Sequence, residues 1–505
     1  MGPITERQDA TLARSVATIA PDAIAPDSLR LPDGALHVAG MRIEHGDVAW
    51  VVDPWSGERI APVVQADLAQ AERAADVARD AFEAMRRMAA FSRRRLLKEI
   101  TRRLTAAREE LATLLSREAG KPKTLARFEV DRTIVVFGLA SEEATRIGGE
   151  VVPLDLTESA ALYRGHWQRV PRGPVLAFTP STAPLHLAAH KIAPALACGA
   201  SVVLKPSPRT PLTALRLAEI VRESGAPPDA VQVVPCSDVV AQALVSHDAF
   251  AVFSFTGSDH IGWQLKAMAG KKHVLLELGG NSACIVHDDV TSLQTVAAAI
   301  CASAFNHAGQ SCNRTQRLFV HRPIADRLLM DLVPRACTYE PSDPRSTTAA
   351  IGPMIDEAAA VRVQALIDEA RSAGANPLAL GPRTGNRIPA TVLRFEHEVR
   401  GLPVIDEEVL GPVLTVHLYD DFDDALRQAG ATRYGLQAGI FTDSLARVRA
   451  AYDRLDVGAL VVNDVPSFRS DAMPFGGRRD SGLGREGVRA AIEELTDRKL
   501  LVQRG

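Results

Sequence analysis

The stretch PVLAFTPSTAPLHLAAHKIAPALACGASVVLK, residues 174–205, contains two short apolar runs separated by a longer run rich in Ala and Leu. The short runs, 174–178 and 201–205, have the length and composition of buried strands. The run between them, 184–199, begins with proline and ends at Gly199, which is typical of a helix. This order predicts a strand, a helix and a second, parallel strand, the repeating unit of an α/β fold.

The same alternation continues along the chain as far as residue 278. Further helices are predicted at 211–225, near 238–246 and at 258–270, and further strands at 231–235, 251–255 and 273–278. Apolar strands that alternate with helices indicate a parallel sheet covered on both faces. Ligands of such sheets bind at the carboxyl ends of the strands. The segments to inspect are therefore those that follow the strands, namely TPSTAP, KPSPRT, TGS and ELGGN.

The remaining regions give weaker patterns. Residues 1–47 are rich in Pro, Asp and Ala and predict an irregular arm, and 51–60 predicts a hairpin with a turn at Ser56-Gly57. The pattern from Asp67, a predicted N-cap, to about Glu118 is helical. A second α/β region follows, with a helix over 291–309 and strands near 315–320, 413–418, 437–441 and 459–463.

Composition excludes several classes of protein. A chain of 505 residues is too long for a single core, so we expect at least two domains. The net charge is −3 without a long block of one sign, which argues against a nucleic-acid or membrane surface. The six cysteines form no CxxC pair, which argues against a zinc site and a disulfide framework. We therefore expect no bound metal. Residues 1–30 lack the layout of a secretion signal, so we expect a cytoplasmic protein.

Cys312 and three sites in the segments that follow the strands suggest chemistry. Cys312, in the polar stretch NHAGQSCNRTQR (306–317), is a packed thiol or a nucleophile, and the residue alone favours the packed thiol. Gly257-Ser258 lies between a strand and a helix, where free N–H groups can bind a phosphate, although a plain turn has the same pattern. Glu277 ends a strand beside two glycines and suits a general base or a surface position. Lys205 ends another strand and can reach a ribose or phosphate, or lie along the surface.

A formal GxGxxG occurs at Gly482, Gly484 and Gly487. Only a short tail follows it, so no strand–turn–helix–strand unit can form around it. We therefore do not interpret it as a dinucleotide-binding motif.

The segments FTGS, ELGGN, GQSC, EEVLGP and MPFGG occur in the order and spacing of the NAD(P)-dependent aldehyde dehydrogenase superfamily, which the chain resembles from about residue 45 to 503. AHKIAPAL and LKPSPRTPLTALRLAE are most similar to the lactaldehyde and phosphonoacetaldehyde dehydrogenase branch. The resemblance implies a Rossmann-like cofactor domain (48–148 and 173–279) and an α/β catalytic domain (280–487). It also implies a small β flap (149–172 and 488–505) that joins copies into a homodimer or homotetramer.

The resemblance assigns catalytic roles. Cys312 would attack an aldehyde carbon, and its backbone N–H would help to hold the oxyanion. Glu277 would activate the water that releases the acid, and Lys191 would lie near the proton path to Glu277. A free thiol has a pKa of about 8.5, so we expect the bound nicotinamide and a helix terminus to help Cys312 ionise.

The resemblance also assigns binding residues. NAD or NADP would bind at Lys205, Pro208, Gly257, Ser258, Gly262, Leu278 and Glu408, with the riboses at Lys205 and Glu408 and the pyrophosphate at Ser258. Arg469 and His186 are candidates for contact with the substrate, and Arg469 could pair with an anionic one. A surface or structural role for Arg469 is the alternative.

Two positions depart from the family pattern. Pro208, followed by Arg209, replaces a glutamate that binds the adenosine ribose and repels a 2′-phosphate, so we expect NADP+ to be used beside NAD+, unless Arg209 points to solvent. Thr182 replaces the usual oxyanion-hole asparagine. This change predicts slow turnover of small aldehydes and leaves a non-catalytic protein of the same fold as an alternative. A dehydrogenase that transfers the acyl group to coenzyme A is a further alternative, which the presence of Glu277 disfavours.

Overall fold

The computed structural model describes residues 31–505, so the first 30 residues of the predicted arm lie outside the described residues. The prediction of an irregular arm is wrong for the rest of this segment. It forms a hairpin of β1 (Leu36–Val38) and β2 (Met41–Ile43). Leu36 and Val38 are buried in the same apolar cluster as the first helix and the first large sheet. Burial against the rest of the fold therefore orders a segment whose own periodicity is weak.

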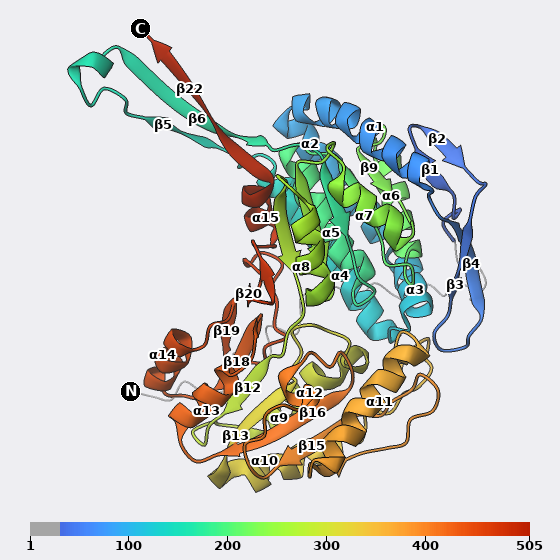
Figure 1. Ribbon diagram of the computed structural model, residues 1–505, viewed down its shortest axis with the longest axis vertical. Helices are drawn as coiled ribbons and strands as arrows, with labels where there is room; N and C mark the ends of the chain where they lie inside the picture. The colour runs from blue at the N-terminus through green and yellow to red at the C-terminus, as the bar shows by residue number, and fades with distance from the viewer. Residues whose placement is uncertain (1–30) are drawn as a thin grey trace, which may run out of the picture. The chain divides into compact units, whose positions relative to one another are not determined.

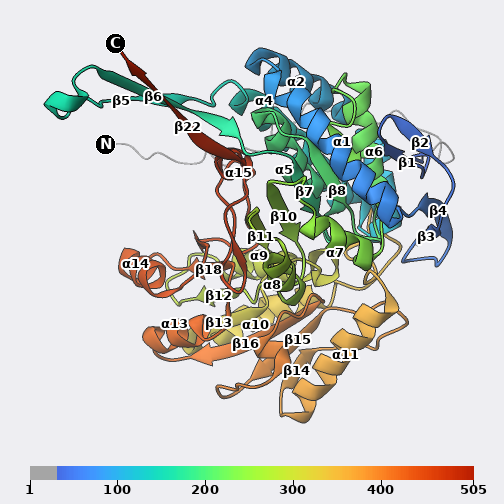
Figure 2. The same ribbon diagram turned by 45° about the horizontal axis from the view of Figure 1, so that its top comes forward.

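The predicted parallel sheet is present. Its strands are β7 (Val175–Phe178), β8 (Val202–Lys205), β9 (Val231–Val233), β10 (Val252–Thr256) and β11 (His273–Glu277). Of these strands, β9 is labelled in Figure 1, and β7, β8, β10 and β11 are labelled in Figure 2. They pair in the order β11-β10-β7-β8-β9, and a two-residue strand, β21 (Gly482–Leu483), joins β11 antiparallel. The strand order reverses between β7 and β10. Ligands of doubly wound sheets bind in the crevice at such a switch point.

Helices cover both faces of this sheet. Between the strands run α5 (Pro184–Cys198), α6 (Leu212–Glu223), α7 (Asp238–Ser246) and α8 (Asp259–Met268). Before them come the hairpin of β3 (Val48–Val52) and β4 (Arg59–Val64) and the helices α1 (Leu68–Arg87), α2 (Ala90–Ala106), α3 (Arg108–Ala119) and α4 (Lys123–Glu143). Asp67 caps α1 in a reciprocal capping box with Gln70, as its position in the sequence predicts. Helix α5 packs against α2, α4 and α6, and α7 packs against α1 and α8.

The second α/β region contains a seven-stranded sheet in the order β14-β15-β16-β13-β12-β18-β19, in which only β14 is antiparallel among the described residues. Its strands are β12 (Ala283–Val286), β13 (Arg317–His321), β14 (Asn376–Ala379), β15 (Thr391–Phe395), β16 (Val413–Tyr419), β18 (Gln437–Phe441) and β19 (Ala459–Val462). Its helices are α9 (Leu293–Phe305), α10 (Arg322–Ala336), α11 (Glu357–Ser372), α12 (Pro403–Asp406), α13 (Phe422–Gly430) and α14 (Leu445–Arg454). The short strands β17 (Tyr434–Gly435) and β20 (Arg478–Arg479) pair with each other.

A separate three-stranded sheet consists of β5 (Gly149–Val152), β6 (Tyr163–Pro171) and the last strand, β22 (Thr496–Arg504). We call this sheet the flap. The helix α15 (Val488–Leu495) leads directly into β22 (Figure 2) and packs against α5. Among residues 31–505, no helix combines the length and the apolar character needed to cross a bilayer.

The two large sheets meet end to end. Strand β11 ends at Glu277, and Gly279 and Gly280 carry the chain to the start of β12. Cys312 lies shortly before the start of β13. Groups at the carboxyl edge of the first sheet and the amino edge of the second are thereby brought together.

Candidate active site

Cys312 lies in a turn rather than at the end of a long helix. We predicted a helix as far as Gly309, but α9 ends at Phe305. His307, Ala308 and Gly309 then take left-handed backbone angles, with φ of 54°, 54° and 66°. A side chain at position 309 would collide with the carbonyl of Gly411, so close packing against that loop requires glycine there.

Two carboxylates and one arginine act on the Cys312 thiol through their charge. Cys312 is partly exposed, whereas Cys301 on α9 is buried. Desolvation, Glu408 and Glu277 raise the pKa of the Cys312 thiol to about 12, and the positive charge of Arg469 opposes them. We expected a helix terminus to lower this pKa, but the protein's own groups raise it overall.

Glu277 is buried at the end of β11. Its backbone carbonyl accepts a hydrogen bond from Gly257 N–H at 3.1 Å. Gly482 of β21 pairs with Glu277, and a Cβ at position 482 would strike the Leu276 carbonyl. Burial and the neighbouring Glu486 raise the pKa of Glu277 well above its ordinary value, and its Oε2 has no hydrogen-bond partner among the described residues. Gly482 of the GxGxxG stretch thus allows close backbone packing beside Glu277.

Two buried cations share the carboxylate of Glu486. Lys191 Nζ donates to Glu486 Oε1 at 3.1 Å and to Ser254 Oγ at 2.8 Å. Arg469 Nη2 donates to Glu486 Oε2 at 3.3 Å, and its guanidinium lies 3.9 Å from the centre of the Phe475 ring. Although burial favours the neutral form, Lys191 and Arg469 lower the pKa of Glu486 to about 2. Lys191 and Arg469 therefore lie in one buried charge network with Glu277.

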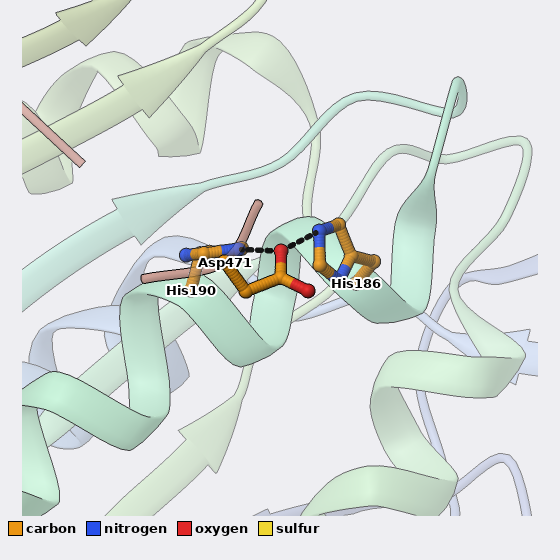
Figure 3. Close-up of side chains that lie close together, drawn as sticks. All are labelled: His186, His190 and Asp471. Atoms are coloured by element: carbon orange, nitrogen blue, oxygen red, sulfur yellow. Dashed lines mark hydrogen bonds and ion pairs between the residues drawn. The ribbon is translucent and has the colours of Figure 1, made fainter. Parts of the chain in front are cut away.

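His186 belongs to a second buried cluster (Figure 3). Asp471 Oδ1 lies 3.3 Å from His186 Nε2 and 3.2 Å from His190 Nε2, and it accepts from Arg132 Nη2 at 2.5 Å. The histidines come from α5 and Arg132 from α4, whereas Asp471 comes from the segment after β19. Burial lowers the pKa of both histidines, that of His190 to about 4, and Arg469 lowers both further.

Thr182 precedes α5 and is anchored by its backbone. Its carbonyl accepts from Lys121 Nζ at 3.0 Å, and Lys121 forms a buried ion pair with Glu129. Glu129 Oε1 in turn accepts from the N–H groups of Leu185 and His186. Because Ala183 has no side-chain oxygen to cap α5, Glu129 supplies the cap from α4.

The turn between β10 and α8 suits a phosphate. A Cβ at Gly257 would collide with the Phe255 ring, and one at Gly262 would collide with Leu278. Ser258 is the N-cap of α8 but makes no side-chain cap hydrogen bond, and the buried hydroxyl of Thr256 has no partner among the described residues. A helix N-terminus with donors to spare is the feature that binds a pyrophosphate, so Gly257, Ser258, Gly262 and Leu278 fit the predicted dinucleotide.

The two predicted ribose ligands lie at different places. Lys205 Nζ pairs with Asp238 Oδ1 at 3.3 Å and lies 5.9 Å from the centre of the Phe178 ring. Glu408 accepts from Gly280 N–H at 3.0 Å, and a Cβ at Gly279 would strike its carboxylate. Burial raises the pKa of Glu408 to about 7. Hydroxyl groups are suitable partners for both side chains.

Pro208 and Arg209 are exposed on the loop after β8. Arg209 Nη2 pairs with Asp356 Oδ2 at 2.8 Å beside a cavity of about 410 Å³ that Trp50 and Glu118 also line. Arg209 therefore already has a carboxylate partner on the second α/β region.

Sequence reasoning missed Glu486, Asp471, His190, Arg132 and Asp238. Glu486 lies inside the SGLGREG stretch, of which the sequence analysis interprets only the glycines. The pairs that reveal these residues join distant positions, for example Lys191 with Glu486, which are 295 residues apart. Periodicity along a chain carries no signal for such contacts.

Comparison with known proteins bears on the whole chain. The model of the aldehyde dehydrogenase family matches residues 43–501. The chain is 38% identical over 400 residues to 3-sulfolactaldehyde dehydrogenase of Priestia aryabhattai, covering 79% of this chain and 83% of that protein.

Two solved structures extend the likeness to the fold. Aldehyde dehydrogenase 21 of Physcomitrella patens, in complex with the product succinate, has a TM-score of 0.90 and 37% identity over 93% of this chain and 98% of that one. Glyceraldehyde-3-phosphate dehydrogenase of Methanocaldococcus jannaschii, complexed with NADP, has a TM-score of 0.87 and 32% identity over 92% and 100%. The chain therefore belongs to the aldehyde dehydrogenase family, and it is an NAD(P)-dependent enzyme that oxidises aldehydes.

Proposed function

We propose that Cys312 is the nucleophile and Glu277 the base in the oxidation of an aldehyde to its carboxylic acid. The observation that supports this assignment is the approach of the Glu277 turn to the Cys312 turn, since Gly280 packs so closely on the Cys312 carbonyl that a Cβ could not be accommodated. When bound, NAD(P)+ supplies the hydride acceptor. The turn between β10 and α8, Lys205 and Glu408 are the groups that would hold it.

The residues divide the reaction into two stages. The Cys312 thiol loses its proton to water as its sulfur bonds to the aldehyde carbon, and loss of hydride from that carbon then leaves a thioester on Cys312. Water then attacks the thioester carbon while Glu277 takes a proton from that water, and the carbon–sulfur bond breaks to release the acid. The raised pKa of Glu277 suits it to accept this proton near neutral pH.

Pre-steady-state kinetics tests these roles. We expect Cys312→Ala to abolish NAD(P)H formation. Glu277→Gln should still give a burst of NAD(P)H of up to one equivalent, after which turnover stalls because the thioester is not hydrolysed. Cys301→Ala is the matched control, since that thiol is buried in the core. A full steady-state rate in either site variant would contradict its role, and rescue of turnover by coenzyme A alone would indicate acyl transfer instead.

We further propose that the substrate carries an anionic group, bound by Arg469. Glu486 is one carboxylate that neutralises two buried cations, Lys191 and Arg469. Burial raises the pKa of Glu277 and opposes its ionisation, so Glu486 is the carboxylate that pairs with both cations. The Nε of Arg469 is buried and without a hydrogen-bond partner among the described residues. An anion would satisfy both the charge and the donor.

The names of the relatives support an anionic substrate. 3-Sulfolactaldehyde carries a sulfonate, succinate a carboxylate and glyceraldehyde-3-phosphate a phosphate. These groups share a negative charge and differ in shape. We therefore assign the charge to the substrate without choosing among the three groups.

Matched pairs of aldehydes test this proposal. A hydrogen bond to a charged group contributes about 1.5–3 kcal/mol, so kcat/KM for 4-oxobutanoate or sulfoacetaldehyde should exceed that for butanal or propanal by about 10- to 100-fold. Arg469→Met should remove this preference. Arg447→Met, which breaks an ion pair between α14 and Asp289 after β12, should not. Equal kcat/KM values for the charged and neutral aldehydes in the wild type would contradict an anionic substrate.

The remaining proposals concern organisation. We infer that residues 48–148 and 173–279 bind the cofactor, that 280–487 carry Cys312, and that 149–172 and 488–505 join copies into a homodimer or homotetramer. The flap supports the last point, because Val151 is 79% exposed and Leu500 51% exposed. We also propose that the enzyme works in the cytoplasm, which its unpaired cysteines favour.

A further inference from the structure

Asp471 joins two helices to the segment that carries Arg469. Its side chain is only 5% exposed. Arg132 donates to both carboxylate oxygens, from Nη2 to Oδ1 at 2.5 Å and from Nε to Oδ2 at 3.2 Å. His186 and His190, one turn apart on α5, direct Nε2 at the same Oδ1 (Figure 3). Three side chains therefore hold one carboxylate.

The protonation of this cluster follows from its partners. Although burial alone would raise the pKa of Asp471, hydrogen bonds from His186, His190 and Arg132 lower it overall, so the group is a carboxylate that can only accept. Both imidazoles are neutral near pH 7, since burial lowers their pKa. His190 therefore carries its single proton on Nε2, which Asp471 accepts at 3.2 Å, whereas His186 Nε2 lies 3.3 Å from the same oxygen as a looser contact.

Two histidines and an aspartate are also ligand types for a transition metal. Here the shared oxygen already faces three nitrogen donors. The positive charges of Arg132 and Arg469 act on the imidazoles, and they would repel a divalent cation as well. The arrangement is that of a hydrogen-bonded anchor rather than of a metal centre.

A second anchor holds the same segment from the other side. Asn313, which follows Cys312 directly, donates through Nδ2 to the Ser467 carbonyl at 3.4 Å. Gln437 donates to the Phe468 carbonyl at 3.3 Å and accepts from Asn313 Nδ2 at 3.1 Å. Arg469 thus lies between an anchor tied to the Cys312 turn and the anchor at Asp471.

We propose that Asp471 is a positioning residue for substrate specificity. By fixing the segment after Phe468 to α4 and α5, it sets the distance of Arg469 from Cys312 and so the place of the substrate's anionic group. This inference rests on the anionic substrate proposed above. It adds that Asp471, Arg132, His186 and His190 determine affinity for the anion without contact with the reacting carbon.

A split between KM and kcat tests the inference. Asp471→Asn keeps the shape but places an NH₂ group among donors, and it should raise KM for 4-oxobutanoate at least tenfold while kcat changes less than threefold. The kcat/KM for butanal should stay within threefold. If the Asp471 variant folds poorly, Arg132→Met tests the same anchor from a partly exposed position. Arg132→Lys keeps a cationic donor there and should retain most of the preference for the anionic aldehyde. Asp289→Asn, which breaks the half-buried pair with Arg447, is the control and should leave both aldehydes unchanged.

The outcomes separate this inference from the proposal on which it rests. A wild type without preference for the anion contradicts the anionic substrate, before any variant is made. If Arg469→Met removes the preference but Asp471→Asn and Arg132→Met keep it, Asp471 does not position Arg469. Equal losses on both aldehydes, or a fall in kcat alone, would show only a structural role and would also overturn the inference.

Discussion

The acid–base groups of the active site influence one another through charge. The pKa of Glu277 is raised because the side chain is buried and because the negative charge of Glu486 acts on it. Glu486 keeps that charge because it pairs with Lys191 and Arg469. The basicity of Glu277 is therefore set by a residue almost at the end of the chain.

Glu486→Gln should shift the pH dependence of turnover. Removing the negative charge makes the ionised form of Glu277 less costly, and the cations that remain act in the same direction, so the pKa of Glu277 should fall. Since the ionised form is the proposed base, the rising limb of the kcat–pH profile should move to lower pH. The profile is measured in steady state under conditions where hydrolysis of the thioester limits the rate. A limb that stays in place or moves to higher pH would show that Glu486 does not control Glu277.

Thr182→Asn tests whether the enzyme lacks one oxyanion donor. The anchors of the TPSTAP loop use the Thr182 carbonyl and the Leu185 and His186 N–H groups, so the side chain can be changed without breaking them. Loss of one such donor costs about 10²–10³ in kcat. We therefore expect slow turnover of acetaldehyde by the wild type and a gain of about tenfold or more from the asparagine. Unchanged or lower kcat in a folded variant would mean that Thr182 has no such role.

The elements that could be predicted from the sequence are those with a strong local pattern. The strands at 174–178, 201–205 and 251–255 and the helix capped by Asp67 were confirmed, because apolar runs and capping residues act over a few positions. β12 was missed because its apolar run follows ELGGN without a break. The helix before Cys312 was predicted too long, because left-handed backbone angles at His307 and Ala308 follow it and alanine gives no sign of such an angle.

The loops that follow β8 and β9 bear on the choice of cofactor. Pro208 removes one carboxylate from the expected 2′-hydroxyl site, but Asp238 at the start of α7 places another beside Lys205. Arg209, which could attract a 2′-phosphate, is paired with Asp356. Use of NADP+ beside NAD+ stays a prediction, and we further predict that Asp238 limits it.

Asp238→Ser should raise kcat/KM for NADP+ relative to NAD+. The Lys205–Asp238 pair is largely exposed on the Asp238 side, and such pairs contribute about 0.2–1 kcal/mol, so the ratio should change by up to about fivefold. Calorimetric binding of 2′,5′-ADP and 5′-AMP gives the same comparison without turnover. Asp248→Ser, on the loop before β10, is the control. A ratio that does not rise, in kinetics and in binding alike, would exclude Asp238 from cofactor selection.

At the scale of the whole molecule, the flap is a sheet whose apolar side chains on β22 are not covered by the described chain. Its strands pair in register over nine residues of β6 and β22, yet of the residues in β22 only Thr496 is buried. A three-stranded sheet needs one covered hydrophobic face for independent stability. Leu500, Leu501 and Val502 are each about half exposed, with values of 51%, 48% and 48%.

A second copy of the chain would supply that cover, and this predicts the effect of charge on β22. Leu500 and Val502 lie on one face of the strand, because side chains alternate along it. Changing both to Glu should convert a wild-type dimer or tetramer into monomers at micromolar concentration, as measured by light scattering after gel filtration, and should lower Tm. Lys499→Glu is the matched control, since it makes the same change of net charge at a polar position on the opposite face, and it should perturb assembly less. If the wild type is already a monomer, the flap has another function; if Leu500→Glu with Val502→Glu stays oligomeric, the copies associate through a different surface.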